Sequence, residues 1–359
     1  MKEYIAFDSH KHYTLAVHEN RRTGHSRQQR INHSLGAIRA HLRGCEAGTD
    51  VAVEATGNWY WILDEIEQAG LRGVLVHPRK AKLMMGMINK TDKLDAEGLN
   101  RLQRNGTLPT VWVPPGELRD LRELTRGRLV LTRERTRLKN RIHATLARYG
   151  LTITEVSDIF GVGVRPTLLE RIGRLPEETR YMTALLLRRL NDLAVQIGAV
   201  EKRLKALVKR TPAMQRLMTA PGVAEILATT IVLEVGDVAR FPSAEHLASY
   251  AGTTPRVKAS GDKVRYGKLR PDVNRYLKWA YLEAANSVAL NHAKKPGRFV
   301  SRLYQRLSVR RGSPKAKGAV ARHLAEATWH MLTRGEDYRD RGAATAGEKL
   351  VARRKVSRK

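Results

Sequence analysis

The chain has 359 residues, more than the roughly 250–300 at which single hydrophobic cores stop growing, so we expect more than one domain. Its 66 Lys and Arg residues against 35 Asp and Glu residues leave a net charge of +31, which predicts a polyanionic partner, DNA or RNA. A membrane role is not expected, because no apolar run reaches the ~20 residues that span a bilayer. With no signal-peptide core and Cys45 as its single cysteine, the chain is expected to be cytoplasmic.

Residues 1–108 predict an α/β domain. Alternating apolar residues indicate two strands joined by a tight turn in residues 3–16 and a third strand at 28–33. The expected order continues with a short helix carrying Leu35, Ile38 and Leu42, a strand at 50–55, a helix at 58–68, a strand at 73–77 and a long helix at 79–103.

Four acidic residues occupy informative positions in this domain. Asp8 lies at the end of the first strand, Glu54 leaves the fourth, and Asp92 and Asp95 share one face of the long helix. We expect them to converge on one edge of the sheet. Carboxylates held together need divalent cations, and oxygen ligands suit Mg²⁺ or Mn²⁺. Two such ions can clamp the attacking and leaving oxygens of a phosphoryl transfer. A solvated helix face is the alternative explanation of the Asp92–Asp95 pair alone.

Residues 109–211 predict a basic, helical coiled-coil region. Apolar residues at three- or four-residue spacing or its multiples indicate one helix between 115 and 149 and a second between about 180 and 209. The two helices pair either as an antiparallel hairpin or with a second subunit, and residues 152–178 form a short helical insertion. Between 126 and 148 the first helix carries eight basic residues and one acidic residue. Its candidate nucleic-acid contacts are Arg126, Arg133, Arg137 and Arg141.

Residues 212–334 predict a mostly helical domain, and residues 335–359 a basic disordered tail. The segment 217–228 is typical of a helix-hairpin-helix, in which Pro221, Gly222 and Val223 turn the chain and offer backbone amides to a phosphate. A plain turn between helices uses the same residue types. The basic composition favours the nucleic-acid interpretation.

A Gly- and Lys-rich loop is expected between residues 252 and 271. In it, Ser260 precedes Gly261 amid positive charge, and an exposed hydroxyl in such a setting can bring a nucleophile to a phosphodiester. From residue types alone, a phosphate-binding loop with an incidental serine is the simpler interpretation, because no His or Cys nearby supplies a base. The candidate nucleic-acid contacts of this loop are Arg256, Lys258, Lys263 and Lys268.

Taken together, the four acids, the basic middle helix, the Ala220-Pro-Gly-Val turn and the Ser260-Gly261 segment resemble the DEDD transposases of bacterial insertion sequences, also described as bridge-RNA-guided recombinases. The resemblance covers about residues 3–335. It implies an N-terminal domain with the Holliday-junction-resolvase variant of the ribonuclease H fold, whose acids match Asp8, Glu54, Asp92 and Asp95. It also implies that Ser260 is the nucleophile, forming a covalent phosphoserine intermediate with DNA.

The same resemblance implies the partners. They are donor and target DNA, a structured noncoding guide RNA that pairs with both, and further copies of the chain in a dimer or tetramer whose subunits share an active site. The protein itself then contacts mostly the backbone of the nucleic acids and recognises their shape. One departure from the family pattern is Val273, which precedes Asn274 where a Lys-x-Gly-Asn-like motif is usual. This departure puts the phosphate role of that turn in doubt, while Ser260 is unaffected.

Two rival functions remain open at this point. The first is a two-metal endonuclease or junction resolvase, in which the acids activate water and Ser260 only contacts phosphate. The second is a nucleic-acid-binding scaffold without catalysis, for which replacement of Asp8 and Asp95 by Asn changes nothing.

Overall fold

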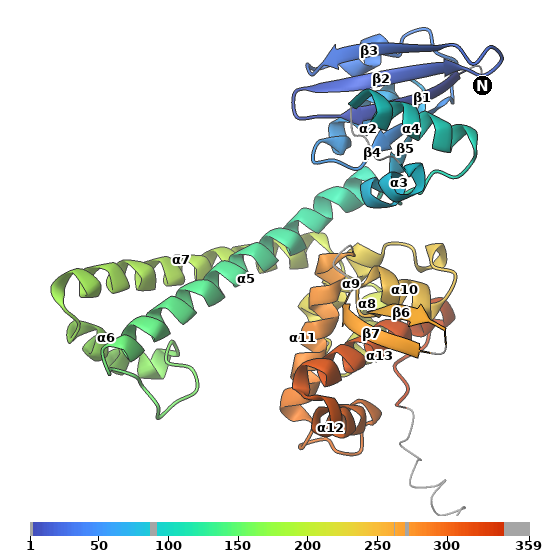
Figure 1. The fold of residues 1–359 in the computed structure, drawn as a ribbon. Helices are drawn as coiled ribbons and strands as arrows, with labels where there is room; N and C mark the ends of the chain where they lie inside the picture. Colours follow the sequence, from blue (N-terminus) through green and yellow to red (C-terminus); the bar gives the residue numbers. More distant parts are fainter. Residues whose placement is uncertain (1–2, 87–91, 262, 270–272, 341–359) are drawn as a thin grey trace, which may run out of the picture. The chain divides into compact units, whose positions relative to one another are not determined.

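The computed structural model describes residues 3–86, 92–261, 263–269 and 273–340, with the backbone alone for 92–94 and 258. The chain divides into two compact units, Met1–Pro114 (unit 1) and Pro115–Lys359 (unit 2) (Figure 1). Unit 2 holds both the basic middle helices and the C-terminal helices, for which separate domains are predicted. No helix of the described residues is long and apolar enough to cross a membrane.

Unit 1 is a mixed α/β structure around a five-stranded sheet in the order β3-β2-β1-β4-β5. The antiparallel start is as predicted: β2 runs antiparallel to both β1 and β3, while β4 runs parallel to β1 and β5. The elements are β1 (Glu3–Ser9), β2 (Tyr13–Asn20), β3 (Ser26–Asn32), α1 (Ala37–His41), β4 (Asp50–Glu54), α2 (Trp59–Gln68), β5 (Arg72–Val76), α3 (Pro78–Met85) and α4 (Asp92–Arg104).

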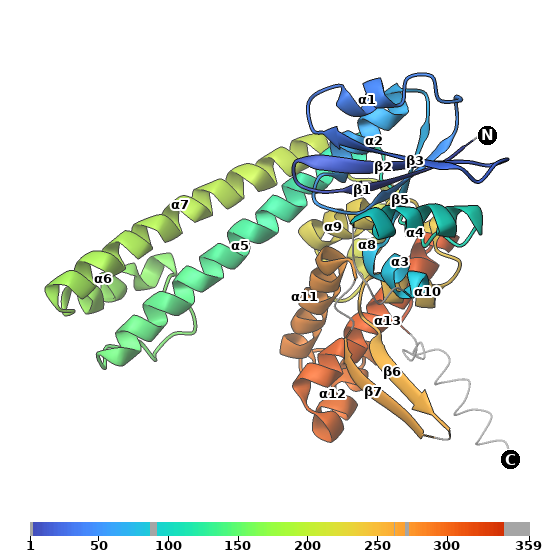
Figure 2. The same cartoon turned by 45° about the horizontal axis from the view of Figure 1, so that its top comes forward.

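Helices cover both faces of this sheet (Figure 2). Alternate side chains of a strand face opposite sides, so β1 contributes Phe7 to a core with α1 and α2, and Ala6 to a second core with α3 and α4. Apolar alternation in the strands thus fixes which helix lies on which face.

The prediction of a single long helix at residues 79–103 is wrong. The chain forms two helices there, because α3 ends at Gly86 in the left-handed conformation (φ 61°) and α4 starts at Asp92. A glycine at φ > 0 terminates a helix readily, since it has no Cβ to clash.

Unit 2 begins with two long helices, α5 (Gly116–Arg148) and α7 (Glu177–Leu207), that pack along each other. Arg128 of α5 pairs with Glu201 of α7, whereas Glu134, further along α5, pairs with Arg189, nearer the start of α7. The helices are therefore antiparallel within one chain, the first of the two predicted arrangements. Leu121 begins the apolar stripe that the sequence predicts for this helix, and this part of the prediction is wrong, because α5 buries Arg122 and leaves Leu121 half-buried.

The rest of unit 2 is a helical bundle with one β-hairpin. Its largest core combines buried residues of α8, α9, α10, α11 and α13. The chain stays in contact with this bundle beyond 335, where a disordered tail is predicted: Asp340 accepts a hydrogen bond from the Phe299 amide at 2.7 Å. Residues 341–359 of that tail lie outside the described residues. The elements after α5 are η1 (Val162–Val164), α6 (Arg165–Gly173), α7, α8 (Pro212–Thr219), α9 (Glu225–Val235), η2 (Val238–Arg240), α10 (Ala244–Tyr250), β6 (Pro255–Ser260), β7 (Lys263–Leu269), α11 (Arg275–Asn291), α12 (Phe299–Arg311) and α13 (Ser313–Arg334).

Candidate active site and nucleic-acid surfaces

Asp8 and Glu54 lie on neighbouring strands at one edge of the sheet. In the parallel pairing of β1 with β4, Phe7 is opposite Val53, and each acid is the next residue. The Asp8 side chain is buried and Glu54 is half-buried. Strand pairing therefore brings together two carboxylates that are far apart in the sequence.

Both acids belong to the face of the sheet that α4 covers. Side chains alternate along a strand, so Asp8 shares a face with Ala6, and Glu54 shares a face with Ala52. Ala6 and Ala52 are buried in one cluster with residues of α3 and α4. The two carboxylates therefore face the helix that carries the other predicted acids.

Helix α4 runs antiparallel to β1 and β4, which brings its first turn toward the same edge. Near its end, Gln103 donates a hydrogen bond at 2.9 Å to the carbonyl of Asp50, the first residue of β4. Arg104 pairs at 2.7 Å with Glu19, near the end of β2. The opposite end of α4, with the half-buried Asp95, therefore lies toward the strand ends that carry the other acids.

Asp92 is the first residue of α4, but its side chain lies outside the described part of the structure. Among the described side chains, Asp8, Glu54 and Asp95 do not form a group whose ligand atoms all lie within 4.8 Å of one another. The oxygen-only donor set is of the type that a hard divalent cation prefers.

His10 is a neighbour of the acidic residues that the sequence analysis missed. Its Nε2 atom lies 3.2 Å from Asp8 Oδ2, and its ring stacks on Tyr13 with centroids 4.6 Å apart. Asn58 also holds this turn, donating from Nδ2 to the His10 carbonyl at 2.8 Å. The polar Ser9-His-Lys-His segment directly after Asp8 was the available signal, and it was interpreted only as a turn.

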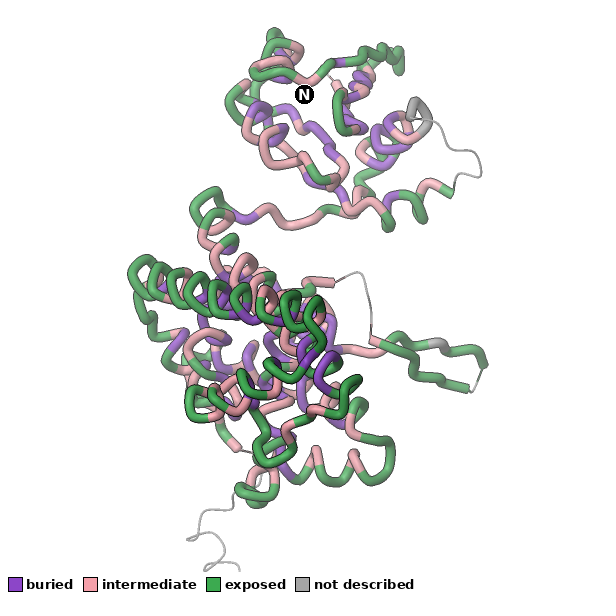
Figure 3. The backbone as a smooth tube through the Cα atoms, turned by 90° about the vertical axis from the view of Figure 1, so that its left-hand side faces the viewer, coloured by how far each residue is buried: buried purple, intermediate pink, exposed green. Residues whose placement is uncertain are grey.

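Ser260 lies at the tip of a β-hairpin, where a loop is predicted. It is the last residue of β6 and pairs with Lys263, the first residue of β7. Gly261, at φ 54°, begins the turn between them. The hairpin strands are exposed over most of their length (Figure 3), and the Ser260 side chain is exposed.

The hairpin has a basic face and an apolar face. Paired residues of antiparallel strands share a face, so the Ser260–Lys263 and Lys258–Arg265 pairs lie on one side. The pairs that alternate with them, Ala259–Val264 and Val257–Tyr266, lie on the other side. The serine thus stands among cationic positions, although the side chain of Lys258 itself lies outside the described part of the structure. The other basic positions predicted for this segment, Arg256 in β6 and Lys268 in β7, are exposed.

Asn274 anchors the chain where it leaves the hairpin and enters α11. Its Oδ1 atom accepts hydrogen bonds from the amides of Tyr276 and Leu277, both at 3.0 Å, and thereby caps the helix. Its Nδ2 atom donates to the buried carboxylate of Glu234 at 2.8 Å. The Asn274 side chain therefore stabilises the fold at this turn.

Val273, the departure from the family pattern, packs against a glycine. A Cβ atom built on Gly252 would lie 2.3 Å from Val273 Cγ2, and Gly252 adopts φ +67°. The open side of Gly252 therefore accommodates the valine. The preceding residues, 270–272, lie outside the described part of the chain.

Gly222 of the predicted helix-hairpin-helix is held tightly against α11. It adopts φ +80°, and a Cβ atom there would lie 2.3 Å from the Ala284 carbonyl oxygen. Pro221 and Val223 are buried, and the Val223 amide donates to the Ala220 carbonyl at 3.1 Å. That amide is therefore already used within the turn and is not directed at a phosphate.

A basic hollow of about 290 Å³ lies beside this turn. Besides Pro221 and Gly222, its lining includes Lys294, Lys295 and Arg298 from the connection between α11 and α12. These side chains, which the sequence analysis missed, supply the positive charge that the turn itself lacks. Their clustering depends on the bundle, because they are far from Pro221 in the sequence.

The four arginines predicted on the basic helix α5 have different environments. Arg126 binds the buried carboxylate of Glu234 through Nε at 2.7 Å and Nη2 at 3.0 Å. Arg133, Arg137 and Arg141 are exposed and spaced four residues apart, so they form one ridge along the helix. We call these three residues the arginine ridge.

Comparison with known proteins identifies two family models in the chain. Residues 7–151 match a DEDD transposase model of the IS110 type, described as "Transposase", and residues 214–300 match the "Transposase IS116/IS110/IS902 family" model. The first match spans the acidic residues of unit 1, and the second spans the Gly222 turn and the serine hairpin. A DEDD-type model implies a divalent metal cofactor.

Similar proteins match most of the chain. The transposase for insertion sequence element IS1111A of Coxiella burnetii is 30% identical over 80% of this chain and 79% of its own length. The "Probable family 20 transposase" of Pseudomonas aeruginosa is 28% identical, over 80% and 85%. The transposase for IS1328 of Yersinia enterocolitica is 25% identical, over 79% and 84%.

The protein is therefore a transposase, an enzyme that acts on DNA by cleaving and transferring strands. It belongs to the IS110 family of insertion-sequence transposases.

Proposed function

We propose that this transposase cuts and rejoins donor and target DNA with Ser260 as the nucleophile. The observation that carries the proposal is the place of Ser260 at the exposed hairpin tip, on the face of Lys263 and Arg265. Nearby cations favour the ionised hydroxyl and the negative charge that develops on the phosphate. The Oγ–phosphorus bond forms, the bond from phosphorus to the leaving deoxyribose oxygen breaks, and the Oγ proton passes to solvent as that oxygen takes one up.

We propose that Asp8, Glu54, Asp92 and Asp95 hold Mg²⁺ or Mn²⁺ in a ribonuclease H-like domain. Supporting this, the sheet order places Asp8 beside Glu54, and α4 brings Asp95 toward the same edge. When bound, such an ion neutralises phosphate charge and polarises the scissile bond. His10, at 3.2 Å from Asp8, positions that carboxylate.

The acids lie in unit 1 and Ser260 lies in unit 2. We propose that the two sites act on the same DNA in a homo-oligomer, a dimer or tetramer, in which different subunits supply them. The nucleic-acid surface of unit 2 then includes the basic face of the hairpin, the hollow with Lys294, and the arginine ridge. Exposed arginines along a helix suit an RNA or DNA backbone, and we assign the ridge to the guide RNA.

Covalent trapping tests the serine directly. The protein is incubated with the RNA flanking its element, labelled junction DNA and Mg²⁺, then denatured and separated on a denaturing gel. We expect a DNA-linked protein band that is lost in Ser260→Ala and depends on Asp8. The matched control is Ser308→Ala, which removes a hydroxyl that only hydrogen-bonds the Gln305 carbonyl.

The rival in this assay is a metal-dependent nuclease that uses water, which the DEDD model and the acid arrangement also suit. It predicts cleaved DNA without linked protein, unchanged in Ser260→Ala, and that result would remove the serine from the mechanism. The scaffold alternative is set aside, because the chain belongs to a family of strand-transferring enzymes.

A further inference from the structure

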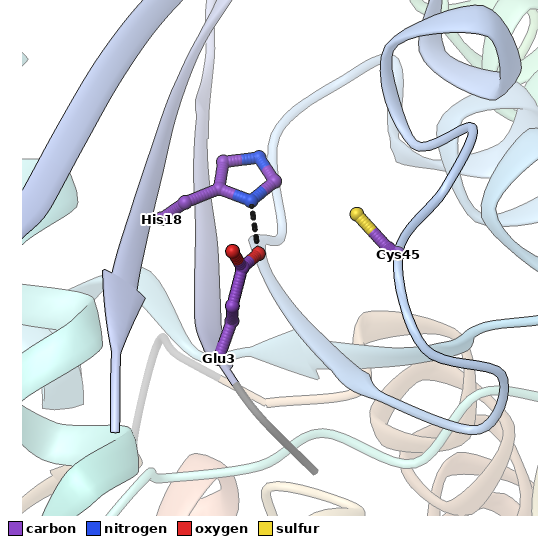
Figure 4. A group of neighbouring side chains, drawn as sticks. All are labelled: Glu3, His18 and Cys45. Atoms are coloured by element: carbon purple, nitrogen blue, oxygen red, sulfur yellow. Dashed lines mark hydrogen bonds and ion pairs between the residues drawn. The ribbon is translucent and has the colours of Figure 1, made fainter. Parts of the chain in front are cut away.

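Three side chains with different metal-binding atoms meet on unit 1, away from the acidic edge. They are Glu3 at the start of β1, His18 in β2 and Cys45 in the loop after α1 (Figure 4). One ligand atom from each, an oxygen, a nitrogen and a sulfur, lies within 4.8 Å of the other two. Among the side chains that the structure describes, they are the one such group of three.

This cluster is separate from the catalytic acids. His18 is paired with Ile5, so it lies on the sheet face covered by α1 and α2, whereas Asp8 faces α4. Glu3 and Asp8 occupy opposite ends of β1, and five residues of a strand span about 16 Å. An ion at the cluster therefore cannot contact the proposed active-site carboxylates.

The His18 ring is already oriented as in a metal site. Its Nδ1 atom points into the cluster, 2.9 Å from Glu3 Oε2, and its Nε2 atom lies 2.8 Å from His41 Nε2. A metal-bound histidine usually donates its other ring N–H to an acceptor, which fixes its orientation. Without metal, Nδ1–H donates to the Glu3 carboxylate and His41 Nε2–H donates to His18 Nε2; when Nδ1 binds a metal, both neutral rings change tautomer and His41 Nε2 becomes that acceptor. Burial lowers the pKa of both rings, that of His41 to about 4.

A cationic side chain borders this position. The Arg27 Nη2 atom lies 3.4 Å from His18 Nδ1 and 3.7 Å from Glu3 Oε2. The Arg27 side chain is 64% exposed, whereas His18 is 2% exposed, so the arginine can turn into solvent while the histidine stays. Glu3 and His18 therefore attract a positively charged group, and Arg27 can give up this position to another cation.

We propose that Glu3, His18 and Cys45 bind one Zn²⁺ ion, with water in the fourth position. Mixed sulfur, nitrogen and oxygen ligands suit Zn²⁺ and disfavour Mg²⁺. On binding, the Cys45 thiol releases its proton to solvent, and the thiolate forms the metal–sulfur bond without any redox change. The ion joins the start of β1 to β2 and to the loop after α1. The site does not depend on the serine mechanism.

Cobalt substitution tests the site, because a thiolate bound to Co²⁺ gives a near-ultraviolet charge-transfer band. Cys45 is the single cysteine of the chain, so any such band reports this residue. Titrating chelator-treated, full-length protein with Co²⁺ is expected to give a band that grows and then saturates. Zn²⁺ should abolish it, and millimolar Mg²⁺ should leave it unchanged. Absence of the band, or failure to saturate, would overturn the proposal.

Variants separate the site from the catalytic acids. Cys45→Ser is expected to lose the band, and Asp8→Asn to keep it with unchanged affinity. Arg27→Gln removes the competing cation and should tighten Co²⁺ binding, on the order of tenfold. Arg30→Gln is the matched control on the same strand, since its guanidinium stacks on Tyr13 instead. Equal affinities of the two arginine variants would contradict the assigned position of the ion.

A measurement on the unaltered protein covers the case in which Cys45→Ser does not fold. Zn²⁺ is expected to slow alkylation of Cys45 by iodoacetamide at least tenfold and to raise the unfolding temperature of unit 1. Burial already raises the pKa of the Cys45 thiol, so the rate without added metal is low and is measured first as the reference. Alkylation that is equally fast with and without Zn²⁺ would exclude the thiolate as a ligand.

Discussion

The guanidinium group of Arg126 donates two hydrogen bonds to the carboxylate of Glu234, at 2.7 and 3.0 Å, and the Glu234 side chain has no exposed surface. The same carboxylate accepts a hydrogen bond from Asn274, the N-terminal cap of α11. One buried acid thus connects the basic helix α5 to the turn that follows the serine hairpin. Arg126, a candidate nucleic-acid contact by sequence, is thus engaged within the fold, with 20% of its side chain exposed.

Replacing Arg126 by Gln is therefore expected to lower the stability of unit 2. The substitution removes two hydrogen bonds to the buried carboxylate, while Arg122, whose Nε lies 3.7 Å from Glu234 Oε2, still offsets its charge, so we expect a loss of about 1.5–3 kcal/mol. The free energy of unfolding, from urea titration of the full chain, measures this loss. Arg133→Gln is the control and should change stability by no more than about 0.5 kcal/mol, since its side chain is exposed. Equal free energies of unfolding for the Arg126→Gln and Arg133→Gln proteins would contradict the structural role of Arg126.

Replacing the three arginines of the ridge by Gln should weaken nucleic-acid binding without unfolding the protein. Each phosphate contact contributes roughly 0.7–0.9 to the slope of log affinity against log salt. The triple variant is therefore expected to lower that slope by about 2 on a structured RNA. A charge-matched variant of α7, with Arg188, Lys202 and Arg203 replaced by Gln, controls for overall charge. The same loss in both variants would indicate diffuse attraction in place of a defined surface.

Gly222→Ala should destabilise the C-terminal bundle. The new Cβ would meet the Ala284 carbonyl oxygen at 2.3 Å, and the residue would have to keep φ +80°. We expect a loss of at least about 2 kcal/mol in the free energy of unfolding.

Gly198→Ala is the matched control for this substitution. Gly198 lies inside α7, and a Cβ built there meets nothing within 4 Å. Alanine in a helix interior should stabilise the protein by about 0.5–1 kcal/mol. The two substitutions are therefore expected to change the free energy of unfolding in opposite directions. A Gly222→Ala protein of unchanged stability would show that the turn shifts freely away from α11.

Gly252 and Val273 are expected to be energetically coupled. Gly252→Ala places a methyl group against Val273 Cγ2 in a left-handed conformation, and Val273→Gly removes the clash but not the backbone strain. A double-mutant cycle of unfolding free energies should therefore give a coupling of about 1 kcal/mol or more. Additive effects would mean that the two residues do not constrain each other.

Much of unit 1 was predictable, because short-range patterns carry the information. Alternating apolar residues predicted the strands, and the apolar run before Glu54 placed that acid at a strand end. The break in the helix expected at 79–103 was missed, because glycine is tolerated inside helices and only the positive φ of Gly86 ends α3.

The serine segment was misjudged for a similar reason. Its glycines and lysines are typical of loops, and the alternation of apolar and polar residues in β6 covers only Pro255–Ser260. A two-stranded hairpin is specified by pairing across the turn, and that pairing is visible only once Ser260 is seen opposite Lys263.

The sequence by itself determined the charge, the strands of unit 1, and the positions of Asp8 and Glu54 at strand ends, since these depend on composition and local periodicity. Only the tertiary structure decided which charged side chains are exposed to a partner and which are paired within the fold. It buried Glu234 against Arg126, left the arginine ridge exposed, and gathered Glu3, His18 and Cys45. The physical reason is that burial and ion pairing join residues distant in sequence, and no local pattern records which distant partner a side chain meets.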